Sequence, residues 1–388
     1  PGLPQMTIVG LPDNAIKESR ERVRLAIKNS GFSFPSSRIT INLAPADIKK
    51  EGPSFDLAIA LSLLASHEQI PPEALHGYVF LGELSLDGRL RPINGALAIA
   101  LACDPSMYKG LILPTANAPE AALANTLKVY PVNSLKEVIH FLSNPGSITP
   151  CVSTGPDILK QDKHWRGDFA DVKGQAQVKR GLEIACAGGH NVLMIGPPGS
   201  GKTMLAKRLS SILPDLSLAE ALEITKIYSI MGLNHAVNGI MTQRPFRNPH
   251  HTSSNIALIG GGSNPKPGEV TLAHNGVLFL DELAEFSRGV LEVLRQPLED
   301  HCVTVARAKG SLRFPAGFML VAAMNPCPCG WHGSNVRSCQ CSSLDIQRYL
   351  TKISGPMLDR IDLHLHVPAL KTDELLDQII NESSAQIK

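Results

Sequence analysis

The sequence predicts an α/β fold in which helices flank a parallel β-sheet, and three segments carry this prediction. An apolar run, residues 191–195, leads into a glycine-rich stretch at residues 196–203, which a helical pattern follows. A second apolar run, residues 277–280, ends in Asp281 and Glu282, and a third, residues 318–323, precedes Met324 and Asn325. Continuous apolar runs of this length are typical of strands that are buried on both faces of a parallel sheet.

The glycine-rich stretch has the spacing of a phosphate-binding loop. It reads Gly196-Pro197-Pro198-Gly199-Ser200-Gly201-Lys202-Thr203, which is G-x-x-x-x-G-K-T between a strand and a helix. Its glycines let backbone N–H groups close on phosphate oxygens, and the start of the helix adds a positive dipole. We expect Lys202 to reach the β- and γ-phosphates of ATP and Thr203 to ligate Mg²⁺. The alternative is a glycine-rich turn that merely contains a lysine, and the flanking strand and helix argue against it.

Three polar residues at strand ends complete the predicted site. Asp281 is expected to hold Mg²⁺, directly or through water, and Glu282 to polarise the water that attacks the γ-phosphate. Asn325 is expected to sense the γ-phosphate or the attacking water, although a turn asparagine before Pro326 is the alternative. An apolar run that ends in Asp-Glu is a weak signal alone, and the upstream P-loop makes it a strong one.

Length and composition bound the organisation of the chain. Its 388 residues favour two or more domains, and 43% of them are hydrophobic, which is enough for a sizeable core. No apolar run reaches the roughly 18 residues that a membrane-spanning helix needs, so no such helix is expected. The formal net charge is only +2, so any contact with nucleic acid must come from local patches. A stretch rich in Ser, Pro, Gly and Thr predicts a linker at residues 143–167, between residues 1–142 and an ATPase part at residues 168–388.

The N-terminal part is predicted to be a compact α+β or α/β unit. Apolar periodicity indicates helices near residues 16–27, 56–65, 96–102, 118–124 and 135–142. Strands are expected at residues 39–43, 78–81, 111–113 and 129–132, with a hairpin at residues 84–90 around Asp87-Gly88.

Two segments of this part resemble the catalytic domain of Lon proteases. They are Gly52-Pro53-Ser54 and the run from Gly82 to Ile93, which contains Leu86-Asp87-Gly88-Arg89. In that family the serine pairs with a lysine that follows the second segment, but here residues 94–102 contain no lysine. Because a serine hydroxyl without a nearby base is a poor nucleophile, we expect a Lon-like fold without peptidase activity. Ser54 is then expected to be a helix N-cap.

A wider set of motifs resembles the ComM/YifB family of magnesium-chelatase-like AAA+ ATPases. Besides the P-loop and residues 277–282, it comprises Pro249-His250-His251-Thr252, Gly260-Gly261-Gly262, Pro267-Gly268-Glu269, Leu272-Ala273-His274, residues 295–300, and residues 323–330, which read AMNPCPCG. The resemblance covers essentially the whole chain, including the Lon-like part. It implies an AAA+ parallel sheet flanked by helices, preceded by a smaller Lon-protease-like α+β domain.

The resemblance also implies a function. It indicates a bacterial, cytoplasmic, ATP-driven homohexamer that works as a DNA branch-migration helicase in recombination and natural transformation, with ATP and Mg²⁺ as cofactors. Residues 168–175 resemble the segment that lies against the adenine in AAA+ ATPases. Relative to the family, the chain is expected to start within the N-terminal domain and to stop before the helical lid with its second sensor arginine.

In an oligomeric ATPase, an arginine that follows a short apolar helix is a candidate for a finger that reaches the neighbouring subunit's γ-phosphate. Arg360 follows such a helix and is our first choice, and Arg348 is the second. Either residue is alternatively a salt-bridged surface arginine.

Two basic segments are candidates for contact with the DNA backbone. The first resembles a pore-facing insertion of this AAA+ clade at residues 232–269 and carries Arg244, Arg247 and Lys266. The second, residues 303–314, is predicted to form a β-hairpin around Gly310 and carries Arg307, Lys309 and Arg313. Cations on such loops neutralise phosphates without reading the sequence. A solvated basic surface is an equally good interpretation of both segments.

Four of the eight cysteines lie close together as Cys327, Cys329, Cys339 and Cys341. Four thiolates can hold a tetrahedral Zn²⁺, so structural zinc is predicted. The C-x-C spacing is tighter than in most zinc sites, which leaves reduced free thiols as the alternative. The adjacent pair His250-His251 is a weak metal signal, because neighbouring histidines rarely face one ion.

Three rival functions remain open at this stage. The chain is alternatively a metal-chelatase-type ATPase that remodels a protein partner, a Lon-like ATP-dependent protease that uses Ser54, or an assembly factor that binds nucleotide without hydrolysing it. The missing lysine argues against the protease. ATPase stimulation by single-stranded or branched DNA distinguishes the motor from the partner-remodelling ATPase, and loss of function in Glu282→Gln excludes the assembly factor.

Overall fold

The structure is a computed structural model that describes residues 5–45, 48–153, 157, 159, 167–236, 238–262, 265–307, 310–369 and 382–388. It divides into two compact units. The first contains residues 1–160 and 228–241, and the second contains residues 161–227 and 242–388. Much of the predicted linker lies outside the described residues.

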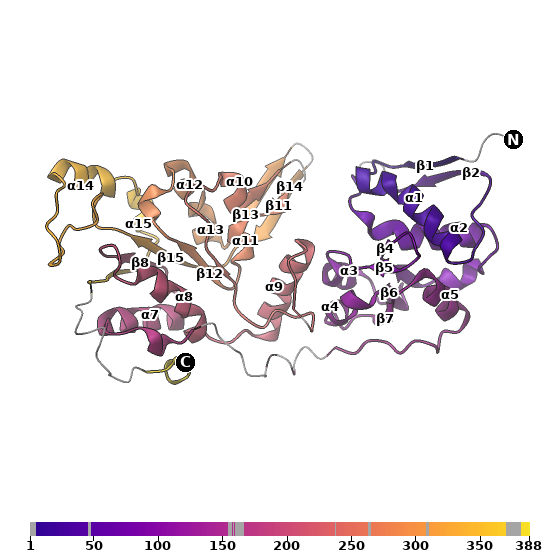
Figure 1. Ribbon diagram of the computed structural model, residues 1–388, viewed down its shortest axis with the longest axis horizontal. Coiled ribbons are helices and arrows are strands. Elements are labelled where there is room, and N and C mark those ends of the chain that lie inside the picture. The colour runs from indigo at the N-terminus through magenta and orange to yellow at the C-terminus, as the bar shows by residue number, and fades with distance from the viewer. Residues whose placement is uncertain are drawn as a thin grey trace. The chain divides into compact units, whose positions relative to one another are not determined.

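A parallel sheet organises the second unit (Figure 1). Among the described residues it has five strands in the order β16-β8-β15-β12-β9, and every neighbouring pair is parallel. Their bounds are Leu363–His366, Val192–Ile195, Met319–Met324, Val277–Leu280 and Phe246–Arg247. The three apolar runs found in the sequence are therefore the three central strands, as predicted.

Successive side chains of these strands enter separate cores on the two faces of the sheet, because a strand has a period of two residues. On one face Val277, Phe279 and Val321 contact α7 (Ala176–Gly188) and α8 (Lys202–Ile212). On the other face Leu278 and Leu280 belong to a cluster that includes residues of α10 (Asn255–Ile259) and α12 (Arg288–Val293).

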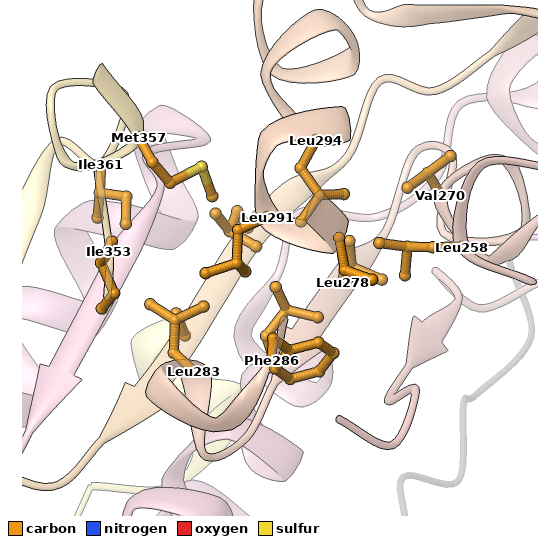
Figure 2. Close-up of a cluster of buried hydrophobic side chains, with 14 of the residues drawn as sticks. Leu258, Val270, Leu278, Leu283, Phe286, Leu291, Leu294, Ile353, Met357 and Ile361 are labelled. Atoms are coloured by element: carbon orange, nitrogen blue, oxygen red, sulfur yellow. The ribbon is translucent and has the colours of Figure 1, made fainter. Parts of the chain in front are cut away.

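Figure 2 shows the second of these cores, with Leu258, Leu278, Leu291 and Leu294 directed toward one another. Each fully buried side chain of this size stabilises the fold by about 1.5–3 kcal/mol. The sheet is thus held from both sides, and the polar residues that follow its strands are left at a rigid edge.

Shorter elements surround the sheet in the second unit. The strands are β10 (Gly260–Gly261) and β11 (Lys266–Pro267), which pair with each other, and β13 (Cys302–Arg307) and β14 (Gly310–Pro315), which form the predicted hairpin. The helices are η4 (Phe169–Asp171), α9 (Leu218–Ile230), α11 (Glu269–Leu272), η5 (Leu283–Glu285), α13 (Arg295–Asp300), α14 (Ser343–Leu350), α15 (Gly355–Leu358) and α17 (Ser384–Ile387).

In the described part of the first unit there are two small parallel sheets. One pairs β1 (Gln5–Val9) with β2 (Arg38–Asn42), and the other has the order β3-β6-β7, with bounds Tyr78–Phe80, Gly110–Pro114 and Lys128–Val132. The expected hairpin is present as β4 (Glu83–Leu84) and β5 (Leu90–Arg91). The helices are α1 (Asn14–Asn29), η1 (Pro53–Phe55), α2 (Asp56–Ser66), η2 (Pro72–Leu75), α3 (Ala96–Ala102), η3 (Thr115–Asn117), α4 (Ala118–Ala122) and α5 (Leu135–Ser143).

The interpretation of Ser54 as a helix N-cap was wrong. Ser54 lies inside η1, whose N-cap is Gly52, and α2 begins two residues later at Asp56. The carboxylate of Asp56 is fully buried and accepts hydrogen bonds from the side chains of Ser19 and Arg22 and from the backbone N–H of Leu84. The start of α2 is therefore fixed by a buried polar cluster rather than by a serine cap.

A segment from the middle of the chain belongs to the first unit. Residues 228–241 are separated from the rest of that unit by residues 161–227, and they include the last three residues of α9. The buried carboxylate of Glu120 accepts hydrogen bonds from Ser229 and Asn234 of this segment and from the backbone N–H of Leu97. The first unit is therefore built from two separate stretches of the chain, which a single continuous range does not describe.

Candidate nucleotide site and cysteine cluster

The P-loop has the backbone that its glycines permit. Gly199 and Gly201 adopt φ angles of +76° and +89°, a region that residues with a side chain rarely adopt. A Cβ at Gly196 would lie 2.1 Å from the carbonyl oxygen of Val367. The loop therefore passes too close to the segment that follows β16 for any residue other than glycine. Helix α8 then begins at Lys202, as predicted, and directs its first N–H groups toward the loop.

Lys202 reaches into the hollow of this loop. Its Nζ donates hydrogen bonds to the carbonyl oxygens of Gly196 and Pro197, at 2.7 and 2.9 Å, and lies 3.3 Å from Oδ1 of Asn325. Burial lowers the pKa of Lys202 from its ordinary value, and the charge of Asp281 opposes this shift. The ammonium group is therefore held where a phosphate would contact it, next to the end of strand β15.

Thr203 and Asp281 present neighbouring oxygens. The Thr203 hydroxyl donates to Oδ2 of Asp281 at 2.7 Å. Adjacent ligands of an octahedral Mg²⁺ with bonds of 2.0–2.1 Å lie about 2.9 Å apart, so these two oxygens fit one magnesium ion. The predicted pair is thus brought together by α8 and β12, elements that are far apart in the sequence.

Glu282 has an unusual backbone and a neighbour that the sequence did not predict. Its φ and ψ angles are 54° and 47°, a left-handed conformation that costs non-glycine residues energy and that is common at functional sites. Its Oε2 lies 3.4 Å from Nδ1 of His251. The ring of His251 in turn lies against that of His250, with centroids 4.1 Å apart and a tilt of 33°, and meets Phe286 edge-on. No sequence pattern indicated this contact, because β9, the strand that precedes His251, has only two residues and shows no period.

Asn325 lies at the end of β15, half-buried beside Lys202. Tyr349 of α14 belongs to the same buried cluster as Met324, the residue that precedes Asn325. Burial raises the pKa of Tyr349 to about 12, so its hydroxyl stays protonated at neutral pH. Asn325 is thereby supported from a second element.

Gln175 offers a test of whether the site fits an adenine ring. Its Nε2 donates to the carbonyl oxygens of Ser200 and Pro368, at 3.3 and 2.8 Å, which places the residue beside the P-loop. In the described part of the chain its buried Oε1 has no hydrogen-bond partner. Adenine carries an exocyclic amino group that donates hydrogen bonds, so an unsatisfied acceptor at this position suits ATP.

The P-loop and the polar residues at the ends of β12 and β15 surround one cavity. It has a volume of about 420 Å³ and is lined by residues 198–204 together with Asp281, Glu282, Met324 and Asn325. The residues expected to carry the chemistry, which are spread over more than 120 positions of the sequence, are therefore assembled around one space.

The two candidate finger arginines differ in their surroundings. Arg360 forms an ion pair with Glu299 and donates to the carbonyl oxygen of Pro356, while its Nε is buried without a partner among the described residues. Arg348 is exposed on α14 and lines a surface hollow of about 480 Å³ with Glu285, Tyr349 and Lys352.

Two of the predicted DNA-contacting arginines have structural partners. Arg247 lies in β9, an edge strand of the sheet. Its Nε and Nη2 donate hydrogen bonds to the two carboxylate oxygens of Glu269, at 2.7 and 2.8 Å. Arg244 pairs with Glu220 at 2.9 Å and donates to the carbonyl oxygens of Pro214, Asp215 and Asn275. Both arginines are therefore held in ion pairs, in a segment that contains a strand of the sheet, and their contact with DNA stays a prediction.

Lys266, Arg307 and Arg313 lie on two-stranded hairpins. Lys266 is exposed in β11, and Arg313 is exposed in β14. The backbone of Arg307 ends β13, and Lys309 lies outside the described residues.

The four clustered cysteines converge as predicted. Their sulfur atoms all lie within 4.8 Å of one another, and three of the pairs are separated by 3.4, 3.7 and 3.6 Å. Four sulfur atoms around a zinc ion with bonds of 2.3 Å are about 3.8 Å apart, so the spacing fits tetrahedral zinc. The backbone N–H of His332 donates to Sγ of Cys327, and backbone N–H groups of Gln340 and Trp331 lower the pKa of Cys329 to about 6. Such donors stabilise the thiolate of Cys329, whereas desolvation and the neighbouring sulfur atoms raise the pKa of Cys339 and of Cys341.

The fold and this site define a P-loop ATPase of the AAA+ class. The model of the family described as "Magnesium chelatase, subunit ChlI" matches residues 168–375, and that of "Subunit ChlI of Mg-chelatase" matches residues 1–117. The whole chain is 46% identical to the uncharacterized protein YifB of Salmonella typhimurium and 44% identical to the competence protein ComM of Haemophilus influenzae, covering 75% and 76% of those proteins. The chain therefore belongs to the ComM/YifB family of magnesium-chelatase-like ATPases.

A more distant similarity concerns part of the chain. Over 153 residues it is 31% identical to the Lon protease of Methanosarcina barkeri, a match to 36% of this chain and 18% of that protein. This agrees with the Lon-like motifs of the N-terminal part. None of the helices among the described residues is both long and apolar enough to cross a bilayer.

Proposed function

We propose that this protein is an ATP-hydrolysing motor that moves DNA through a homohexameric ring in the bacterial cytoplasm and promotes branch migration during recombination. The observation that carries ATP hydrolysis, the central part of the proposal, is the assembly of Lys202, Thr203, Asp281, Glu282 and Asn325 around one cavity. A site that only bound nucleotide would not need a carboxylate beside the position of the attacking water.

Each residue of the site has a distinct role in hydrolysis. The P-loop and Lys202 bind the β- and γ-phosphates, and Thr203 and Asp281 hold Mg²⁺, which neutralises developing charge when bound. Glu282 accepts a proton from water or orients it, and Asn325 holds the γ-phosphate or the same water by a hydrogen bond. Helix α8 and the buried strands keep these groups in fixed positions, so little reorganisation is needed during the reaction.

The DNA part of the proposal rests on the hairpins. Arg313 and Lys266 are exposed on short two-stranded ribbons, which suits contact with phosphates rather than with bases. The similarity to a protein named competence protein ComM supports the same substrate. The eight cysteines form no disulfide in the structure, which suits a reducing compartment such as the cytoplasm.

The experiment compares ATP turnover without DNA, with single-stranded DNA and with a Holliday junction. We expect saturable stimulation by DNA, and we expect Glu282→Gln to lower kcat by about 10²-fold while ATP still binds. A matched control is Glu73→Gln, which changes an exposed carboxylate of the first unit. Turnover that no DNA alters would reject the DNA motor and leave the ATPase standing.

A neighbouring subunit is expected to complete the site with an arginine. If Arg360 is that finger, it must exchange Glu299 for a phosphate of the neighbour, whereas Arg348 needs no such exchange. Mixing a Lys202→Ala protein with an Arg360→Ala protein tests this idea, since mixed rings contain intact composite sites and regain activity. The same mixture with Arg348→Ala identifies which arginine acts in trans.

We also propose that Cys327, Cys329, Cys339 and Cys341 hold one structural zinc ion. The proposal rests on the convergence of the four sulfur atoms. Elemental analysis of purified protein is expected to find about one zinc per chain, and Cys339→Ser to lose most of it. A zinc content near zero in protein purified without chelators would contradict the assignment.

A second candidate function is a partner-remodelling ATPase of the chelatase type. The match of residues 168–375 to the magnesium chelatase model favours it. It predicts stimulation of turnover by a protein partner and none by DNA, so the turnover experiment with DNA distinguishes the two functions.

A further inference from the structure

We infer that the metal bound by the four cysteines is a structural part of the ATP site, where it fixes Asn325 and the P-loop. The inference rests on the proposed zinc ion. It adds that this ion, besides stabilising its own loop, is required for ATP hydrolysis. Three structural connections link the cysteine cluster to the nucleotide cavity.

The first connection runs along the chain. Asn325 follows the last residue of β15, and Cys327 comes two positions later, fully buried. A metal ion on Cys327 therefore fixes the backbone immediately after the sensor residue. With only Pro326 between them, the sensor has little freedom that the metal ligand does not share.

The second connection is direct contact with the P-loop. Gly330 follows the ligand Cys329 and adopts a φ angle of +84°. A Cβ at this glycine would lie 2.6 Å from Cδ of Pro198 and 3.8 Å from Cγ of Asn325. The loop that carries the cysteines therefore lies against the phosphate-binding loop, with no room for a methyl group between them.

The third connection passes through α14. Cys341 is followed by Ser342, the N-cap of α14, whose side chain accepts a hydrogen bond from the backbone N–H of Asp345. At the other end of this helix, Tyr349 is buried in the same hydrophobic cluster as Met324, the residue that precedes Asn325. The two C-x-C pairs thus hold chain segments that reach Asn325 from both sides.

The loop has few other means of keeping its shape. Between Gly330 and Cys341 most side chains are exposed, among them Val336, which is 66% exposed. The aromatic side chain of Trp331 is only half-buried, with Arg337 lying over its ring at 6.0 Å. A segment with so little apolar burial depends on its metal for a defined conformation, as small metal-bound loops do.

Substitution of two glycines in the same loop tests the inference. Gly330→Ala inserts a methyl group against Pro198 without touching a metal ligand. Gly333→Ala is the matched control, because Gly333 also has a positive φ angle, +74°, but nothing lies within 4 Å of its would-be Cβ. We expect Gly330→Ala to keep its zinc and to lose about tenfold or more in kcat/KM for ATP, since small misplacements of positioning groups have effects of this size. Gly333→Ala should remain within about twofold of the parent protein.

Removal of the metal is the second arm. Zinc is extracted with a chelator, Mg²⁺ is restored, and the binding of a fluorescent ATP analogue, kcat and KM are measured before and after Zn²⁺ is added back. In a Trp165→Phe background, Trp331 is the single tryptophan and reports the loop directly through its fluorescence. We expect metal loss to shift this fluorescence and to lower kcat together, and zinc to restore both.

The outcomes separate the inference from the proposals beneath it. Equal effects of Gly330→Ala and Gly333→Ala, or a metal-free protein that hydrolyses ATP at the parental rate, would overturn the inference and leave the ATPase intact. Protein that never binds zinc would overturn the metal assignment and this inference together. An inactive parent protein with full zinc content would instead contradict the proposed function.

Discussion

The nucleotide site and the basic segments differ in how far their local sequence determines their role. At the nucleotide site, residues 198–203, Asp281, Glu282 and Asn325, all predicted from motifs, line the same cavity. In the basic segments, residues of the same type diverge: Arg247 is bound to Glu269, whereas Arg313 is exposed. A P-loop works through backbone shape, which glycine spacing encodes locally. A cation works through the partner it meets, and that partner is chosen by the tertiary structure.

The largest expected effect tests the nucleotide side of this comparison. Lys202→Ala removes the ammonium group that the loop directs into the cavity. We expect kcat to fall by about 10²–10³-fold, because one electrostatic donor to the transition state typically contributes this much. Steady-state ATP turnover measures the change, and circular dichroism checks that the fold is retained. Hydrolysis at the parental rate would remove the ATPase assignment of this cavity.

The contact of His251 with Glu282 sharpens the comparison, because motif spacing did not indicate it. His251→Ala frees a carboxylate that is 60% exposed, which then spends less time in a productive position. We expect kcat to fall by about three- to tenfold with KM unchanged, and His251→Asn to restore part of the loss through its own polar group.

A control for this variant is His364→Ala, which changes an exposed histidine of β16, a strand at the opposite edge of the sheet from β9. If both variants lower kcat equally, or if KM rises instead, His251 does not position Glu282.

The smallest effects concern the two kinds of arginine. Arg313→Ala is expected to weaken DNA binding and to reduce the slope of log K against log salt by about 0.7–0.9, the loss of one phosphate contact. Arg247→Ala is expected to leave that slope unchanged and to lower the free energy of unfolding by about 1 kcal/mol, since a partly buried ion pair is lost. Fluorescence anisotropy and thermal denaturation measure the two effects. The reverse pattern would mean that β9, and not the β13–β14 hairpin, faces DNA.

Much of the fold was predictable because its elements carry strong local signals. The buried strands β8, β12 and β15 are continuous apolar runs, and α3 was placed at its observed bounds from an alanine-rich pattern. Strand β9 was missed, because its two residues are too few to show any period. The same shortness led to the interpretation of its arginine as part of a loop.

The sequence by itself determined which chemistry this protein carries: the P-loop, the acidic pair after a buried strand, and four cysteines within fifteen residues. These are local patterns, and their meaning depends on spacing along the chain. Only the tertiary structure decided which groups meet across long separations, as when Gly330 contacts Pro198, His251 approaches Glu282, and residues 228–241 join the first unit. Such contacts depend on the summed burial and hydrogen bonding of whole elements, which no short stretch of sequence contains.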